Sequence, residues 1–316
     1  MAVVEHRGRV MASELHLIVV EAPSNRSLVD AVARLDHLEA RWSRFRPTSD
    51  ISRINRLGLA GGGVLSVHPD TLVLLAAMVE GHQRTAGAFD PTVLPSLLAE
   101  GHGSGDEDPF WTRALADPAA WSPVALFDVE VDPDRGTVAV PSGLVLDPGG
   151  VGKGLAGDLV AAELVAAGAE GALVGIGGDL ATAGTPPATG WRVEIEWPDR
   201  ADGVLCSIEV GGGGVATSST RSRRWWCDGI ERHHQIDPGS GRCSTTDLAA
   251  ATVVAPSGWS AEVHATAALA AGATDVVRNL EGHGLSGIAV VAGDGGEVLT
   301  TEDLAGIHVR SAGSAA

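Results

Sequence analysis

The sequence contains no tyrosine and only four phenylalanines among its 316 residues. Stacking on a planar ligand must therefore come from tryptophan, phenylalanine, histidine or arginine side chains. Positive charge is also scarce, because 22 basic residues stand against 40 acidic ones and leave a net charge of −18. An anionic surface of this kind repels nucleic acids and acidic membranes, which excludes a general nucleic-acid-binding role. A compact anionic ligand can still bind where a cation or a metal ion is placed locally.

Cysteines and long apolar runs are equally sparse. Cys206, Cys227 and Cys243 show no CxxC spacing and cannot all pair, which is typical of a reducing compartment and argues against a structural zinc site. Residues 1–20 carry charges and histidines throughout, and no apolar run reaches transmembrane length. The sequence therefore predicts a cytoplasmic protein with no membrane insertion.

Strands and helices are mixed along the chain without a repeat, which favours an α+β fold, with mixed sheets flanked by helices, over a doubly wound one. The length suits one large domain, and we predict a single domain over residues 1–310, which could consist of two intertwined subdomains, with a flexible tail at 311–316. Residues 101–108 are rich in glycine and acids and are expected to be a surface insertion. Hydrophobic periodicity predicts strands at 15–20, 143–146, 172–176, 191–197, 250–255 and 287–292, and helices from Ser27, at 69–85, at 155–164 and at 260–271.

The most informative segment is residues 146–158, LDPGGVGKGLAGD. A predicted strand stops at Asp147, the chain passes through glycines with Lys153 among them, and a helical pattern follows. Backbone N–H groups of glycines and of a helix N-terminus can converge on an anion, and Lys153 adds a full positive charge. The segment therefore predicts a phosphate-binding loop.

Two common phosphate-binding motifs do not match. A Walker A loop needs glycine where Asp147 stands and Ser or Thr where Gly154 stands, so the loop lacks its own Mg²⁺ ligand. Residues 175–180 miss the dinucleotide pattern GxGxxG because Leu180 holds the third glycine position. Taken alone, either segment could equally be a tight turn packed against a sheet.

Seven segments in the same order resemble the motifs of the FAD:protein FMN transferases, the ApbE-type flavin transferases. One of them, residues 85–93, is similar to T-x-G-A-F-D-P-T-V almost residue for residue. Together the matches extend over residues 11–272, and seven in the right order are far more specific than one. The others are Met11-Ala12-Ser13, residues 45–55, 146–158, Gly177-Gly178-Asp179, Thr217-Ser218 and residues 234–241.

The resemblance implies a fold with FAD in a central cleft and a Mg²⁺-dependent transfer of FMN from FAD to a Ser or Thr hydroxyl of a target protein, releasing AMP. FAD is then the substrate, Mg²⁺ the cofactor and a flavin-acceptor protein the partner. Where the family has T-S-G-D-Y, residues 217–221 read TSSTR. This departure keeps two alternatives open: an FAD pyrophosphatase that forms FMN and AMP, and a non-catalytic FAD-binding protein.

The same resemblance assigns a metal site. The family uses an aspartate and a threonine four residues apart together with a backbone carbonyl, and the matching positions are Glu262, Thr266 and Gly152. Hard oxygen ligands of this kind suit Mg²⁺, although glutamate lengthens the arm by one methylene. The structural alternative is a solvated Glu262 in a first helical turn and a Thr266 bonded to its own helix.

The remaining assignments concern catalysis and FAD binding. Lys153 is expected to contact the phosphates, and His234 to accept the proton of the attacking hydroxyl or to bind phosphate, with Asp237 beside it. Asp158 could cap or orient the loop or bind the ligand, and Asp179 could equally be a helix N-cap. The predicted FAD-binding residues are Met11, Asn55, Phe89, Asp90, Thr92, Gly149, Gly150, Lys153, Asp158, Gly177, Gly178, Asp179, Thr217 and Ser218.

Overall fold

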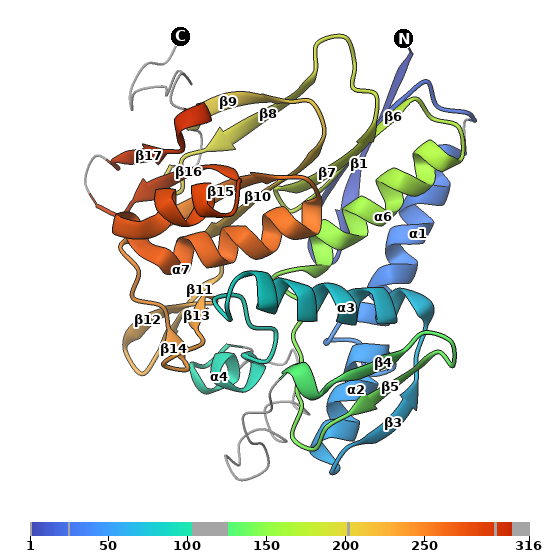
Figure 1. Ribbon diagram of the computed structural model, residues 1–316. Coiled ribbons are helices and arrows are strands. Elements are labelled where there is room, and N and C mark those ends of the chain that lie inside the picture. The colour runs from blue at the N-terminus through green and yellow to red at the C-terminus, as the bar shows by residue number, and fades with distance from the viewer. Residues whose placement is uncertain (1, 25, 103–125, 201–202, 294–295, 305–316) are drawn as a thin grey trace. The chain divides into compact units, whose positions relative to one another are not determined.

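The chain forms two compact units in a computed structural model, and each unit is assembled from separate segments (Figure 1). Unit 1 comprises residues 1–35, 153–222 and 245–316, and unit 2 comprises residues 36–152 and 223–244. The residues that the structure describes are 2–24, 26–102, 126–200, 203–293 and 296–304.

Two predicted segments fall outside the described residues. They are the surface insertion from residue 103 onward and the tail at 311–316.

Unit 1 is built on an eight-stranded sheet whose neighbouring strands are antiparallel throughout the described residues. The predicted strands at 15–20, 172–176, 250–255 and 287–292 are confirmed as β2, β6, β15 and β16. In spatial order the strands are β1 (Val3–Val10), β2 (Ser13–Val20), β6 (Gly171–Ile176), β7 (Asp179–Gly184), β10 (Gly213–Ser219), β15 (Leu248–Ala255), β16 (Ser286–Val291) and β17 (Val298–Thr300), and the short helix η3 (Glu302–Leu304) follows.

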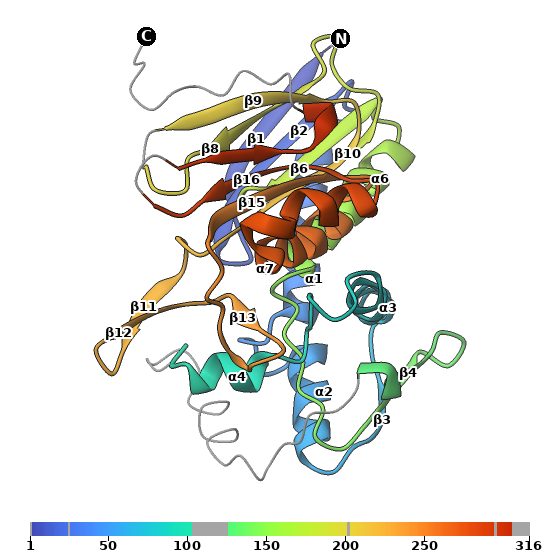
Figure 2. The same ribbon diagram turned by 60° about the vertical axis from the view of Figure 1, so that its left-hand side comes forward.

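Both faces of this sheet are covered. Helices α6 (Gly152–Ala166) and α7 (Gly258–Gly282) lie on one face, and the hairpin of β8 (Trp191–Glu196) and β9 (Val204–Val210) lies on the other (Figure 2). Strand β8 buries every second residue, as its alternating sequence predicts. Strand β15, with a layer on each side, is buried at nearly every position, which is typical of a strand covered on both faces.

Helix α7 is longer than the predicted helix at 260–271. It begins at Gly258 and continues past a kink at Gly272, where φ is 74° and ψ is 171°, to Gly282. Glycine is required at this position because a positive φ is strained for other residues, and an added Cβ would lie 3.1 Å from a carboxylate oxygen of Asp247. That carboxylate accepts the Ala273 N–H at 2.8 Å, which gives the helix a new start after the kink.

Unit 2 surrounds three small sheets with helices. Buried Leu94, Leu97 and Val145 pack with Trp225 and Ile236, so residues 223–244 join the core of this unit. Its elements are the second half of α1 (Ser27–Trp42), α2 (Asp50–Leu59), α3 (Pro69–Arg84), α4 (Leu94–Ala99), η2 (Leu126–Asp128), the sheet β3 (Gly63–Ser66), β5 (Thr137–Val140) and β4 (Glu130–Asp132), and the hairpins β11 (Arg224–Cys227) with β12 (Ile230–His233) and β13 (Ile236–Asp237) with β14 (Arg242–Cys243).

The predicted strand at 143–146 is wrong, because this segment forms no strand. The buried side chain of Asn55 takes the place of a neighbouring strand: its amide donates to the Leu146 carbonyl at 2.9 Å and accepts the Leu146 N–H at 2.8 Å. The Gly143 N–H donates to the Gly58 carbonyl of α2 at 2.8 Å. An apolar run signals burial, but it does not say whether a strand or a side chain satisfies its backbone groups.

The mixture of helices and antiparallel sheets confirms the α+β prediction. In the part of the chain that the structure describes, none of the helices combines the length and the apolarity needed to cross a membrane.

Candidate functional site

Two hairpin turns meet at one end of the unit 1 sheet. Residues Met11-Ala12 join β1 to β2 and Gly177-Gly178 join β6 to β7, and all four have positive φ, as two-residue turns of this type require. The Gly177 N–H donates to the Glu14 carbonyl at 2.8 Å, and a Cβ on Gly177 would lie 2.9 Å from Ser13. The first turn, in contrast, uses non-glycine residues in a conformation that costs free energy, a feature that often marks functional sites.

The side chain of Lys153, in the first turn of α6, lies between two buried carboxylates. Its ammonium contacts the Asp179 carboxylate at the start of β7 and Glu262 Oε1 of α7 at 2.7 Å. The side chains of Asp179 and Glu262 are only 7% and 5% exposed. Asp179 Oδ1 accepts the Thr217 N–H of β10 at 3.1 Å, and Glu262 Oε2 accepts the Gly154 N–H at 2.8 Å. We call Lys153, Asp179 and Glu262 the charged triad, and it joins α6, α7, β7 and β10.

The triad carries one negative charge in excess when its three groups are ionised. Burial alone would lower the pKa of Lys153, but the charges of Asp179 and Glu262 outweigh it and hold that pKa above its usual value. Burial raises the pKa of Glu262 to about 7. The positive charge of Lys153 opposes this rise, but the negative charge of Asp179, which also pairs with Lys153, adds to it. A buried carboxylate in this situation favours either a proton or a further cation.

This excess charge predicts a pH-dependent stability in metal-free buffer. The folded-state pKa of Glu262, about 7, lies above the ordinary glutamate pKa of 4.5, so the folded protein binds this proton more tightly than the unfolded chain. Its contribution is therefore complete below about pH 4.5 and is lost as the pH rises through 7, by up to about 3 kcal/mol. Urea unfolding between pH 5 and 8 measures it, with Glu262→Gln as the reference. Equal slopes in the two proteins would contradict this assignment.

Several backbone N–H groups of the Gly-rich loop before α6 already donate hydrogen bonds to acceptors within the protein. The Gly149 N–H donates to Asp147 Oδ1 at 2.9 Å, and the N–H groups of Val151 and Gly152 donate to the Pro148 carbonyl at 3.1 and 2.8 Å. The Gly154 N–H is already bonded to Glu262. The expectation that these amides converge on an anion is therefore wrong at these four positions.

Asp158, which the sequence left open between a cap and a ligand contact, caps a helix. Its carboxylate, on α6, accepts the N–H groups of Gly258 and Trp259 at 2.7 and 2.9 Å, the first two residues of α7. Ser257, at the N-cap position itself, makes no side-chain cap bond. Close approach of the two helices is possible because Gly154 faces Gly258, where a Cβ would lie 2.3 Å from the Gly258 carbonyl oxygen.

Replacing Asp158 should destabilise unit 1 without touching the triad. Asp158→Ala removes two hydrogen bonds to a charged acceptor, and we expect a loss of about 2 kcal/mol in the free energy of unfolding. Asp158→Asn keeps one acceptor oxygen and should lose less. Urea unfolding measures both variants, with the exposed Glu163→Ala on the same helix as the control. A loss in Asp158→Ala no larger than in that control would refute the capping role.

Hydroxyl groups continue the site from the triad along β10 and α7. Ser218 Oγ lies 3.2 Å from Thr266 Oγ1, and Thr217 Oγ1 lies 2.9 Å from Thr252 Oγ1 of β15. The Thr266 hydroxyl also donates to the Glu262 carbonyl at 3.3 Å, so it does bond to its own helix. Glu262, in contrast, is buried rather than solvated. Asp179 lies in a strand, so its N-cap alternative is wrong.

The predicted residues of unit 2 organise two connected loops. Asp90 Oδ1 accepts the N–H and the hydroxyl of Thr92 at 2.8 and 2.7 Å, which forms a tight turn. The Pro91 carbonyl then accepts the Asp147 N–H at 2.7 Å, so this turn is tied to the Gly-rich loop. Phe89 is buried and its N–H donates to Thr85 Oγ1 at 3.0 Å.

His234 and Asp237 lie in a separate stretch of unit 2. Asp237 accepts the N–H groups of Gly239 and Ser240 at 3.1 and 3.2 Å, so it shapes the turn between β13 and β14. Its hydrogen bond with Ser240, above all, lowers the pKa of its carboxyl. His234 Nε2 lies 3.1 Å from Gln235 Nε2. The catalytic roles of both residues stay predictions.

Two features of the site escaped the sequence analysis. Arg44 is 5% exposed and pairs with Asp147 at 3.1 Å, so it anchors the Gly-rich loop, and nothing in its sequence surroundings marks it out. The second feature could have been found in the sequence, because Lys153 is the only lysine among the 22 basic residues. A chain that otherwise uses arginine throughout keeps the compact ammonium where two carboxylates converge.

Several known proteins are similar to this chain in sequence or in structure. The sequence pattern described as the ApbE family matches residues 11–291. The chain is 24% identical over 308 residues to an FAD:protein FMN transferase of Haemophilus influenzae, covering 94% of this chain and 88% of that protein. It is 28% identical over 264 residues to one of Klebsiella pneumoniae, covering 81% and 75%. The apo form of the Pseudomonas stutzeri flavinyl transferase ApbE has a similar structure, with a TM-score of 0.79 at 28% identity over 95% of both chains.

Proposed function

Because the chain belongs to the ApbE family, we propose that it is an FAD:protein FMN transferase that moves FMN from FAD to a Ser or Thr hydroxyl of an acceptor protein and releases AMP. The relatives named above carry the activity in their names. The observation that carries the proposal in this chain is the charged triad, which holds its only lysine in a half-buried, hydrogen-bonded position.

The reaction is a phosphoryl-type transfer. The acceptor oxygen forms a bond to the phosphorus of the FMN half, the pyrophosphate P–O bond breaks, and its electron pair leaves with AMP. Catalysis of such a step consists mainly of positioning and of neutralising charge. Lys153 suits the second task, since Asp179 and Glu262 account for two of its three N–H groups within the described residues and the third can bind a phosphate oxygen.

The donor set of this site fits a magnesium ion. Glu262 and Thr266 place a carboxylate and a hydroxyl one helical turn apart, and the triad carries excess negative charge. Glu262 and Thr266 would hold the ion, with the Gly152 carbonyl as the predicted third ligand. When bound, Mg²⁺ supplies positive charge to the pyrophosphate oxygens.

Most of the remaining residues hold other groups in place, and one of them accepts a proton. Asp179 and Glu262 fix the direction of the Lys153 ammonium, while Arg44 and Asp147 hold the Gly-rich loop. The hydroxyl proton of the acceptor is assigned to His234, as the resemblance implies. The FAD-binding roles of Met11, Asn55, Phe89 and the other predicted residues belong to the same proposal.

One assay tests the proposal. The protein is incubated with FAD, Mg²⁺ and an acceptor protein that bears the family's target pattern, and flavin fluorescence that survives denaturation is followed on the acceptor. We expect labelling that disappears with EDTA and with an acceptor whose target Ser or Thr is replaced by valine. Free FMN and AMP without labelling would instead identify a pyrophosphatase. Unchanged FAD with measurable FAD binding would identify a binding protein.

A further inference from the structure

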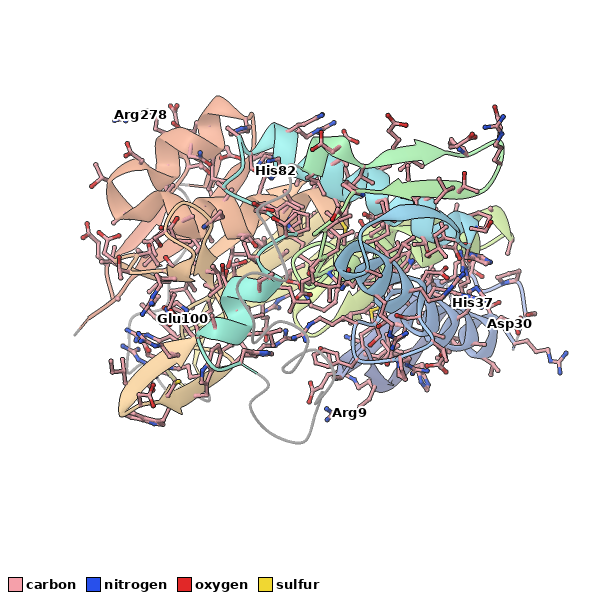
Figure 3. The ribbon with its side chains drawn as sticks, turned by 90° about the horizontal axis from the view of Figure 1, so that it is seen from below. Arg9, Asp30, His37, His82, Glu100 and Arg278 are labelled. Atoms are coloured by element: carbon pink, nitrogen blue, oxygen red, sulfur yellow. The ribbon has the colours of Figure 1, made fainter. Side chains whose placement is uncertain are left out.

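A cluster of two imidazoles and one carboxylate, none of them assigned a role above, lies in unit 2. His37 comes from the second half of α1, His68 is the N-cap residue of α3, and Asp70 stands in the first turn of α3. One potential ligand atom from each residue lies within 4.8 Å of the others. Figure 3, which labels His37, shows these helices from below.

The distances within the cluster are those of ligands around one ion. His68 Nδ1 lies 3.2 Å and His37 Nε2 lies 3.8 Å from Asp70 Oδ2. Ligand atoms in a tetrahedral site with metal–nitrogen bonds of about 2.0–2.1 Å are about 3.4 Å apart. An ion therefore needs only small side-chain adjustments to reach all three.

The orientation of His68 agrees with this arrangement. The Asp70 N–H donates to His68 Nδ1 at 3.2 Å, so in the structure the lone pair of that nitrogen points toward Asp70. The two imidazole rings meet edge to face with centroids 4.8 Å apart. A metal ion would replace the N–H as the partner of Nδ1.

The exposure and the surroundings of the three side chains also suit a metal ion. The side chains of His37, His68 and Asp70 are 39%, 33% and 14% exposed, so an ion can enter from solvent. The buried Asp50 faces the cluster from α2, where its Oδ2 accepts the His68 N–H at 2.9 Å and its Oδ1 pairs with Arg53. Imidazole nitrogens favour zinc, cobalt, nickel or copper, whereas Mg²⁺ prefers an all-oxygen octahedral shell.

We propose that His37, His68 and Asp70 form a site for a divalent transition-metal ion, with Zn²⁺ as the reference ligand. The ion joins the second half of α1 to the start of α3 inside unit 2, and water fills the remaining coordination position. Its function is to fasten these two helices. The site shares no residue with the triad.

Isothermal titration of the full chain with Zn²⁺, repeated with Mg²⁺, tests the proposal. His37→Gln removes one ligand, and His68→Asn removes another while keeping a residue that caps helices well. Loss of a residue that merely supports a ligand weakens binding about 10–100-fold, so we expect each variant to lose at least about 100-fold in Zn²⁺ affinity at one site. His6→Gln, an unrelated histidine on β1, should bind as the wild type does.

Co²⁺ provides a second readout, because its visible spectrum distinguishes nitrogen and oxygen ligands from thiolates. We expect a cobalt spectrum without a thiolate charge-transfer band, which is lost in His37→Gln, and Zn²⁺ should raise the melting temperature of the wild type but not of that variant. Zn²⁺ isotherms that are identical in wild type, His37→Gln and His68→Asn would overturn the proposal. So would a thiolate band, which would place the bound ion at a cysteine, or Mg²⁺ binding at the same site with equal affinity.

Discussion

Lys153→Met should reduce the free energy of unfolding by about 3–5 kcal/mol, because it leaves two buried carboxylates without their cation. The loss should be smaller at pH 5 than at pH 8, since protonation neutralises the carboxylates once their counter-ion is gone. Lys153→Arg should not restore stability, because a planar guanidinium cannot occupy the same position between Asp179 and Glu262. Urea unfolding at the two pH values measures all of these effects.

Two further variants make this result specific. Lys153→Met combined with Glu262→Gln removes one of the stranded charges and should recover a large part of the lost stability. Arg34→Met, which breaks a partly exposed pair with Glu163, should lose less than about 1 kcal/mol. If Lys153→Met were no less stable than Arg34→Met, the triad would not be a coupled buried group.

Glu262→Gln should lower the rate of Mg²⁺-dependent flavin transfer at least about 1000-fold, which corresponds to about 4 kcal/mol of transition-state stabilisation. The amide keeps the size of the side chain but gives up the negative charge that a magnesium ion needs. Glu262→Asp should retain more activity, because aspartate keeps the negative charge and is the residue that the family resemblance implies at this position. Transfer rates measured as a function of Mg²⁺ concentration separate a loss of metal affinity from a loss of turnover.

The neighbouring threonine allows a parallel test. Thr266→Val removes the hydroxyl at constant shape and should raise the Mg²⁺ concentration needed for half-maximal transfer, whereas Thr266→Ser should not. Glu209→Gln on the exposed face of β9 is the matched control for a lost carboxylate. Wild-type Mg²⁺ dependence in Glu262→Gln or in Thr266→Val would refute the assignment of the metal ligands.

The elements that the sequence predicted well are those whose period is unambiguous. The alternation of residues 191–197 and the apolar run at 172–176 both became strands, since a residue's burial there follows directly from its position in the pattern. The segment at 143–146 was apolar too, yet it is held by the side chain of Asn55, a residue 91 positions away from Leu146. No local pattern contains that information.

The candidate site likewise has features that the sequence determines and features that depend on the tertiary structure. The sequence by itself determined the chemistry: a single lysine among glycines, an acid and a threonine four residues apart, and motifs that resemble those of a flavin transferase. Only the tertiary structure decided that Lys153 pairs with Asp179 and Glu262, which are 26 and 109 residues away, and that Asp158 caps a helix 100 residues further on. It also brought His37 and His68 together with Asp70. The physical reason is that periodicity records which face of an element is buried, whereas the partners of a buried charge depend on how distant elements pack.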